Sequence, residues 1–127
     1  MVNSISFADF FPVSLGVMSI IFHIAEPQHW KTAQSSGRYQ PEQFAAERFI
    51  HCSTPEQIVQ VANARFRGRT DLLLLTIDTD KVGPEIRYEN LEGGSQLFPH
   101  IYGELNLDAV TKVSDFLPGS DGYFALP

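Results

Sequence analysis

The feature of this sequence that most constrains its fold is a continuous apolar run between two aspartates, Asp71 and Asp78. The residues between them are Leu, Leu, Leu, Leu, Thr and Ile. Because a strand with one exposed face carries a polar residue at every second position, an apolar run of this length predicts a strand buried on both faces. The run therefore predicts the central strand of a sheet.

Shorter segments predict the elements around this strand. Apolar or alternating runs predict strands at residues 20–25, 49–50, 86–89 and 109–116, and a strand–loop boundary at 97–105, where Pro99 argues against a central position. Apolar residues at helical spacing, with start and stop signals, predict helices at 26–36, 41–47 and 54–66. From Pro118 onward we expect a tail rich in Gly and Pro. These elements predict an α+β domain with two to three helices and a mixed or antiparallel sheet.

Residues 1–17 precede Met18, which stands directly before the first predicted strand. We expect them to be an N-terminal extension or a misassigned start, with residues 18–127 as the single domain. The alternative is an extra strand or turn that packs on the core. The segment has no positively charged start and is interrupted by Asp9 and Pro12, so it suits neither a signal peptide nor a membrane span. No membrane partner is therefore expected.

Composition limits the partners and the compartment. The net charge is −6 and the pI about 5.0, so the chain lacks a basic stripe for duplex nucleic acid, although one or two Arg could hold a small anionic ligand. The single Cys52 excludes an internal disulfide and a Cys-based metal cluster, and it fits a reducing compartment. We therefore expect a cytoplasmic protein, and the oligomeric state stays open. Since adjacent strand residues point to opposite faces, Cys52 is expected to be a small buried residue rather than a nucleophile paired with His51.

The stretch at 49–56 reads Phe, Ile, His, Cys, Ser, Thr, Pro, Glu. Ser53 with Glu56 fits a capping box, and Thr54 before Pro55 fits an N-cap with Pro at the first helical position. His51 would then lie at the end of a short strand, beside a helix N-terminus whose unpaired N–H groups favour an anion. This arrangement would suit a phosphate or an oxyanion.

Three of the four histidines, His23, His51 and His100, lie beside strand-like apolar runs, whereas His29 lies on the first predicted helix. Strand ends at one edge of a sheet can converge, so we expect these three to line one pocket, with Tyr102 at its wall, and to bind or move protons there. No two have the short spacing of zinc ligands, so no metal is expected. The alternative is that each is a half-buried His bonded to the backbone.

A few further side chains are candidates for ligand contact. Tyr39, Tyr88 and Tyr102 could each stack on a flat group such as a nicotinamide, although Tyr88 better fits a core-edge residue. Glu89 and Glu104 are candidate acids, and each could equally be solvated.

Several blocks of the sequence are distinctive. They are Ile-Phe-His-Ile-Ala at 21–25, Trp30, Gly-Arg-Tyr at 37–39, Phe-Ile-His-Cys-Ser at 49–53, Leu-Leu-Leu-Thr-Ile-Asp at 73–78, and Phe-Pro-His-Ile-Tyr-Gly at 98–103 with Leu105. Over residues 20–116 they resemble the uncharacterised bacterial family known as domain of unknown function 952. Residues 1–17 lie outside this pattern.

A more distant similarity is to the ADP-ribosyltransferase superfamily, including its RNA 2′-phosphotransferase branch, although the Gly-Thr that follows the first-strand His there is absent. The similarity implies an ADP-ribosyltransferase-like fold and a transferase that uses NAD as substrate and requires no cofactor. It implies that His23 bonds the ribose, and that His51 sits by the nicotinamide ribose or a phosphate. His100 or Glu104 would close the site. The binding residues expected beside these are Ser53, Tyr39, Tyr102 and Glu104.

Three functions follow as hypotheses. The first is an enzyme that acts on NAD, ADP-ribose or a related phosphorylated nucleotide through a pocket of His residues. The second is a non-catalytic module that binds a nucleotide or another small anion. The third is a structural domain with core histidines. The clustered histidines favour the first two.

Overall fold

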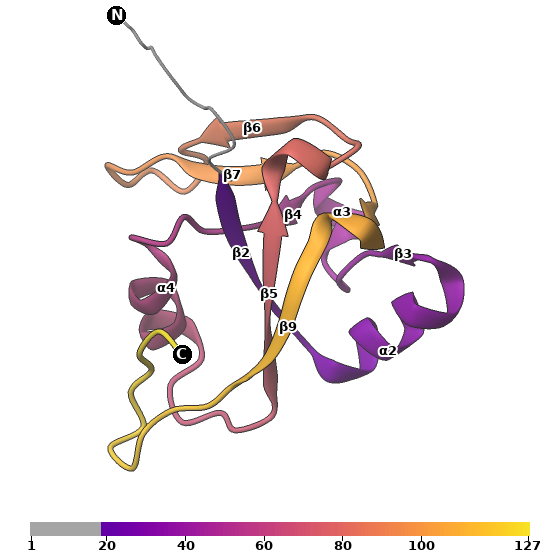
Figure 1. Cartoon of the computed structure of the whole chain (residues 1–127). Coiled ribbons are helices and arrows are strands. Elements are labelled where there is room, and N and C mark those ends of the chain that lie inside the picture. The colour runs from indigo at the N-terminus through magenta and orange to yellow at the C-terminus, as the bar shows by residue number, and fades with distance from the viewer. Residues whose placement is uncertain (1–18) are drawn as a thin grey trace, which may run out of the picture.

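The apolar run between the two aspartates forms β5 (Leu72–Asp78), in a computed structural model that describes residues 19–127 (Figure 1). β5 lies between β2 (Ile20–Ala25) and β9 (Val110–Phe116), and both pairings are antiparallel. Leu75 and Ile77 join one core cluster, and Leu72 and Leu74 join another. Because alternate residues point to opposite faces, apolar clusters cover both faces of β5, which confirms the predicted central strand.

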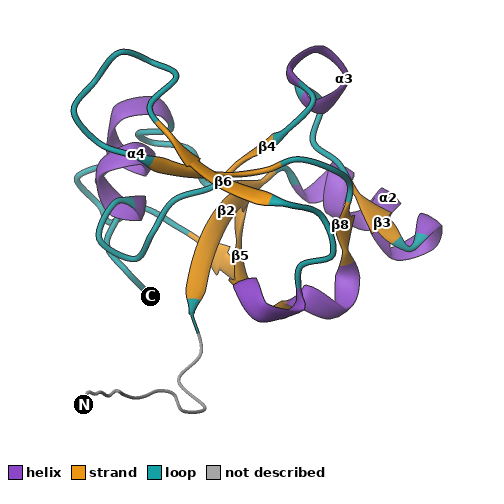
Figure 2. Ribbon diagram, turned by 90° about the horizontal axis from the view of Figure 1, so that it is seen from above, coloured by secondary structure: helices purple, strands orange, loops and turns teal. Residues whose placement is uncertain are grey.

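A second sheet runs across one end of the first (Figure 2). Its order is β4 (Ile50–His51), β7 (Phe98–Ile101) and β6 (Ile86–Glu89), all antiparallel. β3 (Arg38–Tyr39) pairs with β8 (Leu105–Asn106) as a separate antiparallel ribbon. A bridge between Phe22 and Ser53 joins β2 to the chain that follows β4. The described residues therefore hold short antiparallel sheets and no barrel.

The expectation that Pro99 keeps its strand away from a central position is wrong, because β7 lies between β4 and β6. Pro99 pairs with Tyr88 of β6, and its carbonyl accepts a hydrogen bond from the N–H of Cys52. Cys52 stands just beyond the two residues of β4. The hydrogen bond that Pro cannot donate would therefore fall where the β4 pairing already ends.

Three α-helices lie in the described residues: α2 (Pro27–Ser36), α3 (Phe44–Glu47) and α4 (Ile58–Arg65). Two short 3-10 helices, η1 (Thr79–Lys81) and η2 (Leu107–Ala109), follow β5 and β8. α2 begins at Pro27 and ends at Gly37, whose φ of 85° suits glycine. α2 and α4 lie at opposite sides of the molecule (Figures 1 and 2).

The predicted start of the third helix at Thr54 is wrong, since α4 begins at Ile58. Ser53 cannot serve as the expected cap, because its backbone N–H and carbonyl bond Phe22. The N–H of Thr54 donates to Oε1 of Gln57, while the N–H groups of Gln57 and Ile58 donate to the carbonyl of Thr54. One irregular turn therefore precedes the helix.

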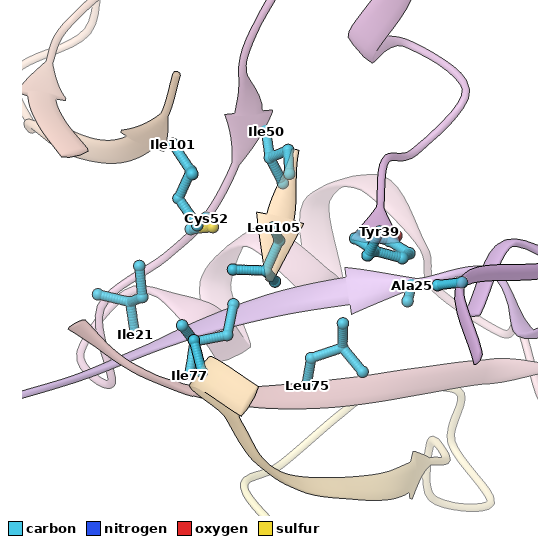
Figure 3. Close-up of a cluster of buried hydrophobic side chains, with 11 residues drawn as sticks. Ile21, Ala25, Tyr39, Ile50, Cys52, Leu75, Ile77, Ile101 and Leu105 are labelled. Carbon is cyan, nitrogen blue, oxygen red and sulfur yellow. The ribbon is translucent and has the colours of Figure 1, made fainter. Parts of the chain in front are cut away.

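The main core lies between the sheets (Figure 3). Side chains from β2 and β5 point toward side chains from β3, β4, β7 and β8. The buried side chains labelled there are Ile21, Ala25, Tyr39, Ile50, Cys52, Leu75, Ile77, Ile101 and Leu105. Cys52 is 4% exposed, as expected of a small buried residue. This core fixes the backbone positions of the residues that lead into the cavity described below.

The C-terminal segment is anchored rather than loose. Phe124 is buried and its ring lies 4.7 Å from that of Phe116, and its N–H donates to Oδ1 of Asn63 on α4. The expected extension at residues 1–17 lies outside the described residues. Among the helices of residues 19–127, none combines the length and apolarity needed to cross a bilayer.

Candidate functional site

A cavity of about 380 Å³ is lined by residues of β2, β3, β4, β6 and β7 and of the helices α2, α3 and α4. All four histidines of the chain line it. Among the residues that line it are His23, His29, Tyr39, Glu26, Glu42, Glu47, His51, Cys52, Ser53, Arg65, Glu89, Glu92 and His100. The structure therefore brings His23, His51 and His100 to one cavity, while the sequence had set His29 aside.

His23 is a buried residue in the wall of this cavity. Its Nδ1 donates to the carbonyl oxygen of His51 at 2.6 Å, so Nε2 accepts from the hydroxyl of Tyr39 at 2.8 Å. His23 is 7% exposed and Tyr39 is fully buried. Both ring nitrogens thus have partners within the chain, and the two bonds define one neutral tautomer.

Burial keeps this pair uncharged. Desolvation lowers the pKa of His23 from 6.5 to about 4, against the opposing effect of the backbone bond to His51. Burial likewise raises the pKa of Tyr39. His23 is therefore neutral near pH 7 and has no free nitrogen with which to take a proton or hold a ligand.

His51 is placed differently. Its side chain is 39% exposed, and Nε2 donates to Oε1 of Glu47 at 2.8 Å. Nδ1 of a neutral ring is then an acceptor, and it has no partner among residues 19–127. Arg48, with a φ of 69°, turns the chain between the end of α3 and β4 and so brings Glu47 and His51 together. A left-handed residue that is not glycine stores strain, which marks this turn as specifically held.

His100 has a carboxylate partner too, although its side chain is only 3% exposed. Nδ1 donates to Oε1 of Glu89 at 2.9 Å, and the hydroxyl of Tyr102 donates to the same oxygen at 2.6 Å. The Arg87 guanidinium lies 4.3 Å from the ring centroid of Tyr102. The bond from Tyr102, followed by that from His100, lowers the pKa of the Glu89 carboxyl, which is thereby held as a carboxylate.

The two carboxylate-bound imidazoles face each other. His51 and His100 are directly paired across β4 and β7, and their rings meet edge to face with centroids 5.2 Å apart. Phe49 packs against both rings, with centroids 4.7 Å from His51 and 4.4 Å from His100. Each ring keeps one nitrogen without a partner in the described residues. In the neutral tautomer that the bond to its carboxylate defines, each ring has an acceptor nitrogen left, which can take a proton or a hydrogen bond.

Of the remaining residues predicted for the site, two line the cavity and two do not. Ser53 and Tyr39 line the cavity, but the backbone of Ser53 bonds Phe22 and the hydroxyl of Tyr39 bonds His23. Tyr102 is not part of the lining and acts through Glu89. Glu104 is exposed and outside the lining, because β7 ends at Ile101 and Glu104 lies beyond it.

Sequence reasoning missed Glu47, His29 and Arg65 and ranked Glu89 no higher than Glu104. Glu47 and His51 have i, i+4 spacing, but α3 ends between them, so the spacing alone did not predict their contact. His29 lines the cavity, and its Nδ1 is buried without a partner in the described part of the chain. We have no physical account of that atom.

Among residues 19–127, no three His, Cys, Asp or Glu side chains are grouped so as to hold a metal ion. The expectation that no metal is required stays a prediction.

Most of the chain matches a known protein family. The family described as protein of unknown function (DUF952) matches residues 24–113. The chain belongs to the DUF952 family. The match runs from the end of β2 into β9 and includes His51, His100 and both of their carboxylate partners. The resemblance seen in the sequence blocks is thereby confirmed. None of the curated proteins matches the chain.

Solved structures of another protein share the fold. Crystal structures of protein CC0527 from Caulobacter crescentus, as the natural chain and as a double mutant, are 32% identical to this chain. They cover 85% of it and 95% of their own chain, with TM-scores of 0.76 and 0.75. The solution NMR structure of CC0527 is 33% identical, with coverage of 86% and 94% and a TM-score of 0.74. These relatives establish the fold, and their descriptions state no activity.

Proposed function

We propose that this DUF952 protein is an enzyme that acts on NAD, ADP-ribose or a related nucleotide, with His51 and His100 as its acid–base pair. The observation that carries the proposal is the pairing of these rings across β4 and β7, each bonded through one nitrogen to a carboxylate. A carboxylate that holds one N–H of an imidazole orients the ring and fixes its tautomer, so the other nitrogen is left as the acceptor.

The same geometry suits cleavage of an N-glycosidic bond. When the bond between nicotinamide and ribose in NAD breaks, neutral nicotinamide leaves with the bonding electrons, and positive charge develops on the ribose, as in glycoside hydrolysis. Water or another hydroxyl then adds to that carbon, and His51 or His100 takes its proton. Glu47 and Glu89 supply negative charge beside the developing cation.

His23 takes a different role from the one that the superfamily similarity implies. Both of its nitrogens are occupied by the chain, so we assign it as a positioning residue. It holds the carbonyl of His51 and the hydroxyl of Tyr39, and thereby the backbone from which the His51 ring projects.

The second candidate function is a module that binds the nucleotide without chemistry. One observation favours it: Glu104, which lies near the position where the ADP-ribosyltransferases that the sequence resembles often carry Glu, is exposed and outside the cavity. Glu89 is the acid that contacts His100. The enzyme proposal requires Glu89 to act in place of the acid that such transferases carry, and the binding-module proposal does not.

The test is release of nicotinamide from NAD by the full chain, together with NAD binding by calorimetry. We expect slow turnover, reduced at least about 10²-fold by His51→Ala and by His100→Ala, since general acid–base catalysis contributes factors of this size. Glu56→Gln, an exposed glutamate outside the cavity, is the control and should leave the rate unchanged. Binding without turnover would support the binding module. Neither binding nor turnover would contradict both candidates.

A further inference from the structure

The charge of the cavity lining points to the kind of group that the site holds. Five glutamates line it, and Arg65 is its one arginine or lysine among the described residues. Arg65 bonds Glu92 at 2.6 Å, and Glu26 is held by Arg69, which lies outside the lining. The three glutamates left without a cationic partner from Arg or Lys are Glu42, Glu47 and Glu89.

These three carboxylates differ in depth. Glu42 and Glu47 are exposed at the rim, where solvent screens their charge. The side chain of Glu89 is 24% exposed and is fixed by Tyr102 and His100. Glu89 is thus the least exposed of the three carboxylates, and the part of the cavity that it shares with the buried His100 is its inner end.

A second observation shows that this inner end is suited to a ligand. His100 is 2% exposed and lines the cavity, and its Nδ1 is held by Glu89. Its Nε2 has no hydrogen-bond partner in residues 19–127. Because Nδ1 donates to Glu89, Nε2 of the neutral ring is an acceptor, so an N–H group of a ligand that enters the cavity can donate to it.

From these observations we infer that the site takes a ligand whose inner end is an organic cation, such as a pyridinium ring or a protonated amine on a flat or apolar body. The inference rests on the proposed function, since it concerns the same cavity. An anionic group would face three carboxylates with no free arginine or lysine among the lining residues, whereas a cation gains attraction from each. The phosphates of a nucleotide would therefore lie at the mouth or outside it. The aromatic and apolar lining, which includes Phe22, Phe66 and Phe98, suits the body of such a ligand.

The experiment compares three probes of nearly the same shape on the full chain: 1-methylnicotinamide, a cation; nicotinamide, which is neutral; and nicotinate, an anion. Affinities are measured by calorimetry at pH 8, where imidazoles are ordinarily neutral. We expect the cation to bind at least about tenfold more tightly than nicotinate, which converts to about 1.4 kcal/mol, and nicotinamide to fall between them. Added salt should weaken the binding of the cation and leave the binding of nicotinamide unchanged.

Two variants identify the source of the preference. Glu89→Gln should reduce the ratio of cation to neutral affinity by about tenfold, and Glu42→Gln by about twofold to fivefold, because exposed charges contribute less. Because a general disturbance of the cavity would weaken the binding of both probes, it cancels in the ratio of their affinities. Glu56→Gln, exposed and off the cavity, is the matched control and should leave the ratio as it is.

The outcomes separate this inference from the proposed function. Tighter binding of nicotinate than of the cation, or a ratio unchanged in Glu89→Gln, would overturn the inference and leave the acid–base site standing. Absence of binding by all three probes would also overturn it. The proposed function is judged separately, by turnover and binding of NAD in the His51 and His100 variants.

Discussion

Three histidines lie on strands of this molecule, and the contacts of His23 differ from those of the pair His51 and His100. His23 on β2 bonds Tyr39 and a backbone carbonyl, and both of its nitrogens are occupied. His51 and His100, on β4 and β7, each bond one carboxylate and keep one nitrogen free of partners in the described residues. The first arrangement stabilises the fold, and the second can bind a ligand or move a proton.

The difference teaches that occupancy of the ring nitrogens, rather than position on a strand, separates a histidine that is fully bonded within the chain from one that is available to a ligand. Burial alone does not separate them, because His23 is 7% exposed and His100 is 2% exposed. The predictions below test this contrast through the free energy of unfolding, from the largest expected effect to the smallest.

His23→Ala should cost about 4 kcal/mol of unfolding free energy. It leaves the Tyr39 hydroxyl and the His51 carbonyl buried without partners, at about 1–3 kcal/mol each, and opens a small cavity. Urea unfolding followed by circular dichroism measures the loss. A loss under about 1 kcal/mol would mean that His23 is not the structural member of the contrast.

Acid should destabilise the protein through the same residue. His23 has a pKa of about 4 when folded against 6.5 unfolded, so between these pH values the unfolded state binds more protons and stability falls as the pH falls. This contribution of His23 to the unfolding free energy is fully present above pH 6.5 and is lost by about pH 4. At 1.36 kcal/mol per pH unit, it amounts to about 3 kcal/mol.

The comparison for this pH effect is the difference in unfolding free energy between the natural chain and His23→Gln from pH 7.5 to 4. Gln does not titrate, so other groups cancel in the difference. The difference should shrink steadily as the pH falls from 6.5 to about 4. A difference that does not vary with pH would mean that His23 is not held neutral by burial.

Tyr39→Phe should cost about 1.5 kcal/mol, because it removes the donor to Nε2 of His23 and leaves that nitrogen unsatisfied while keeping the packed ring. Thermal unfolding under matched conditions measures it. Addition of His23→Ala to Tyr39→Phe should cost less than the sum of the single losses, since the two residues share one bond. Additive losses would show that the bond contributes nothing to stability.

His51→Ala should change the free energy of unfolding by less than about 1 kcal/mol. Its side chain is 39% exposed and its bond to Glu47 lies near the surface, where such pairs contribute little. The carbonyl that His23 needs belongs to the backbone and is retained. A loss comparable to that of His23→Ala would place His51 among the structural residues.

Much of the fold could be predicted from local pattern. The apolar run at β5 gave its central place, and Pro27 and Gly37 marked the ends of α2, because each signal acts within a few residues. The start of α4 could not be predicted, since Ser53 is committed to a bridge with Phe22, a partner distant in the sequence. The prediction from Pro99 was wrong for the same reason. Whether the N–H that Pro lacks costs the sheet a hydrogen bond depends on where β4 ends, and β4 is distant in the sequence.

The site could be predicted only in part. The three histidines were found because each interrupts or follows an apolar run, but their partners lie on other elements, and pairing across strands decides those contacts. Glu89 reaches His100 through the register of β6 and β7, which single-sequence spacing does not contain. Gly103, in the block with His100, is explained by packing: a Cβ there would lie 2.8 Å from Pro84.

The most direct test of the central claim is an NMR titration of the full chain with NAD, read from the ring resonances of the histidines. The account predicts that the resonances of His51 and His100 shift together with one binding curve, while those of His23 stay in place because its nitrogens have no room for a ligand. A binding curve reported by His23 with His51 and His100 unchanged, or no change in any ring, would contradict it.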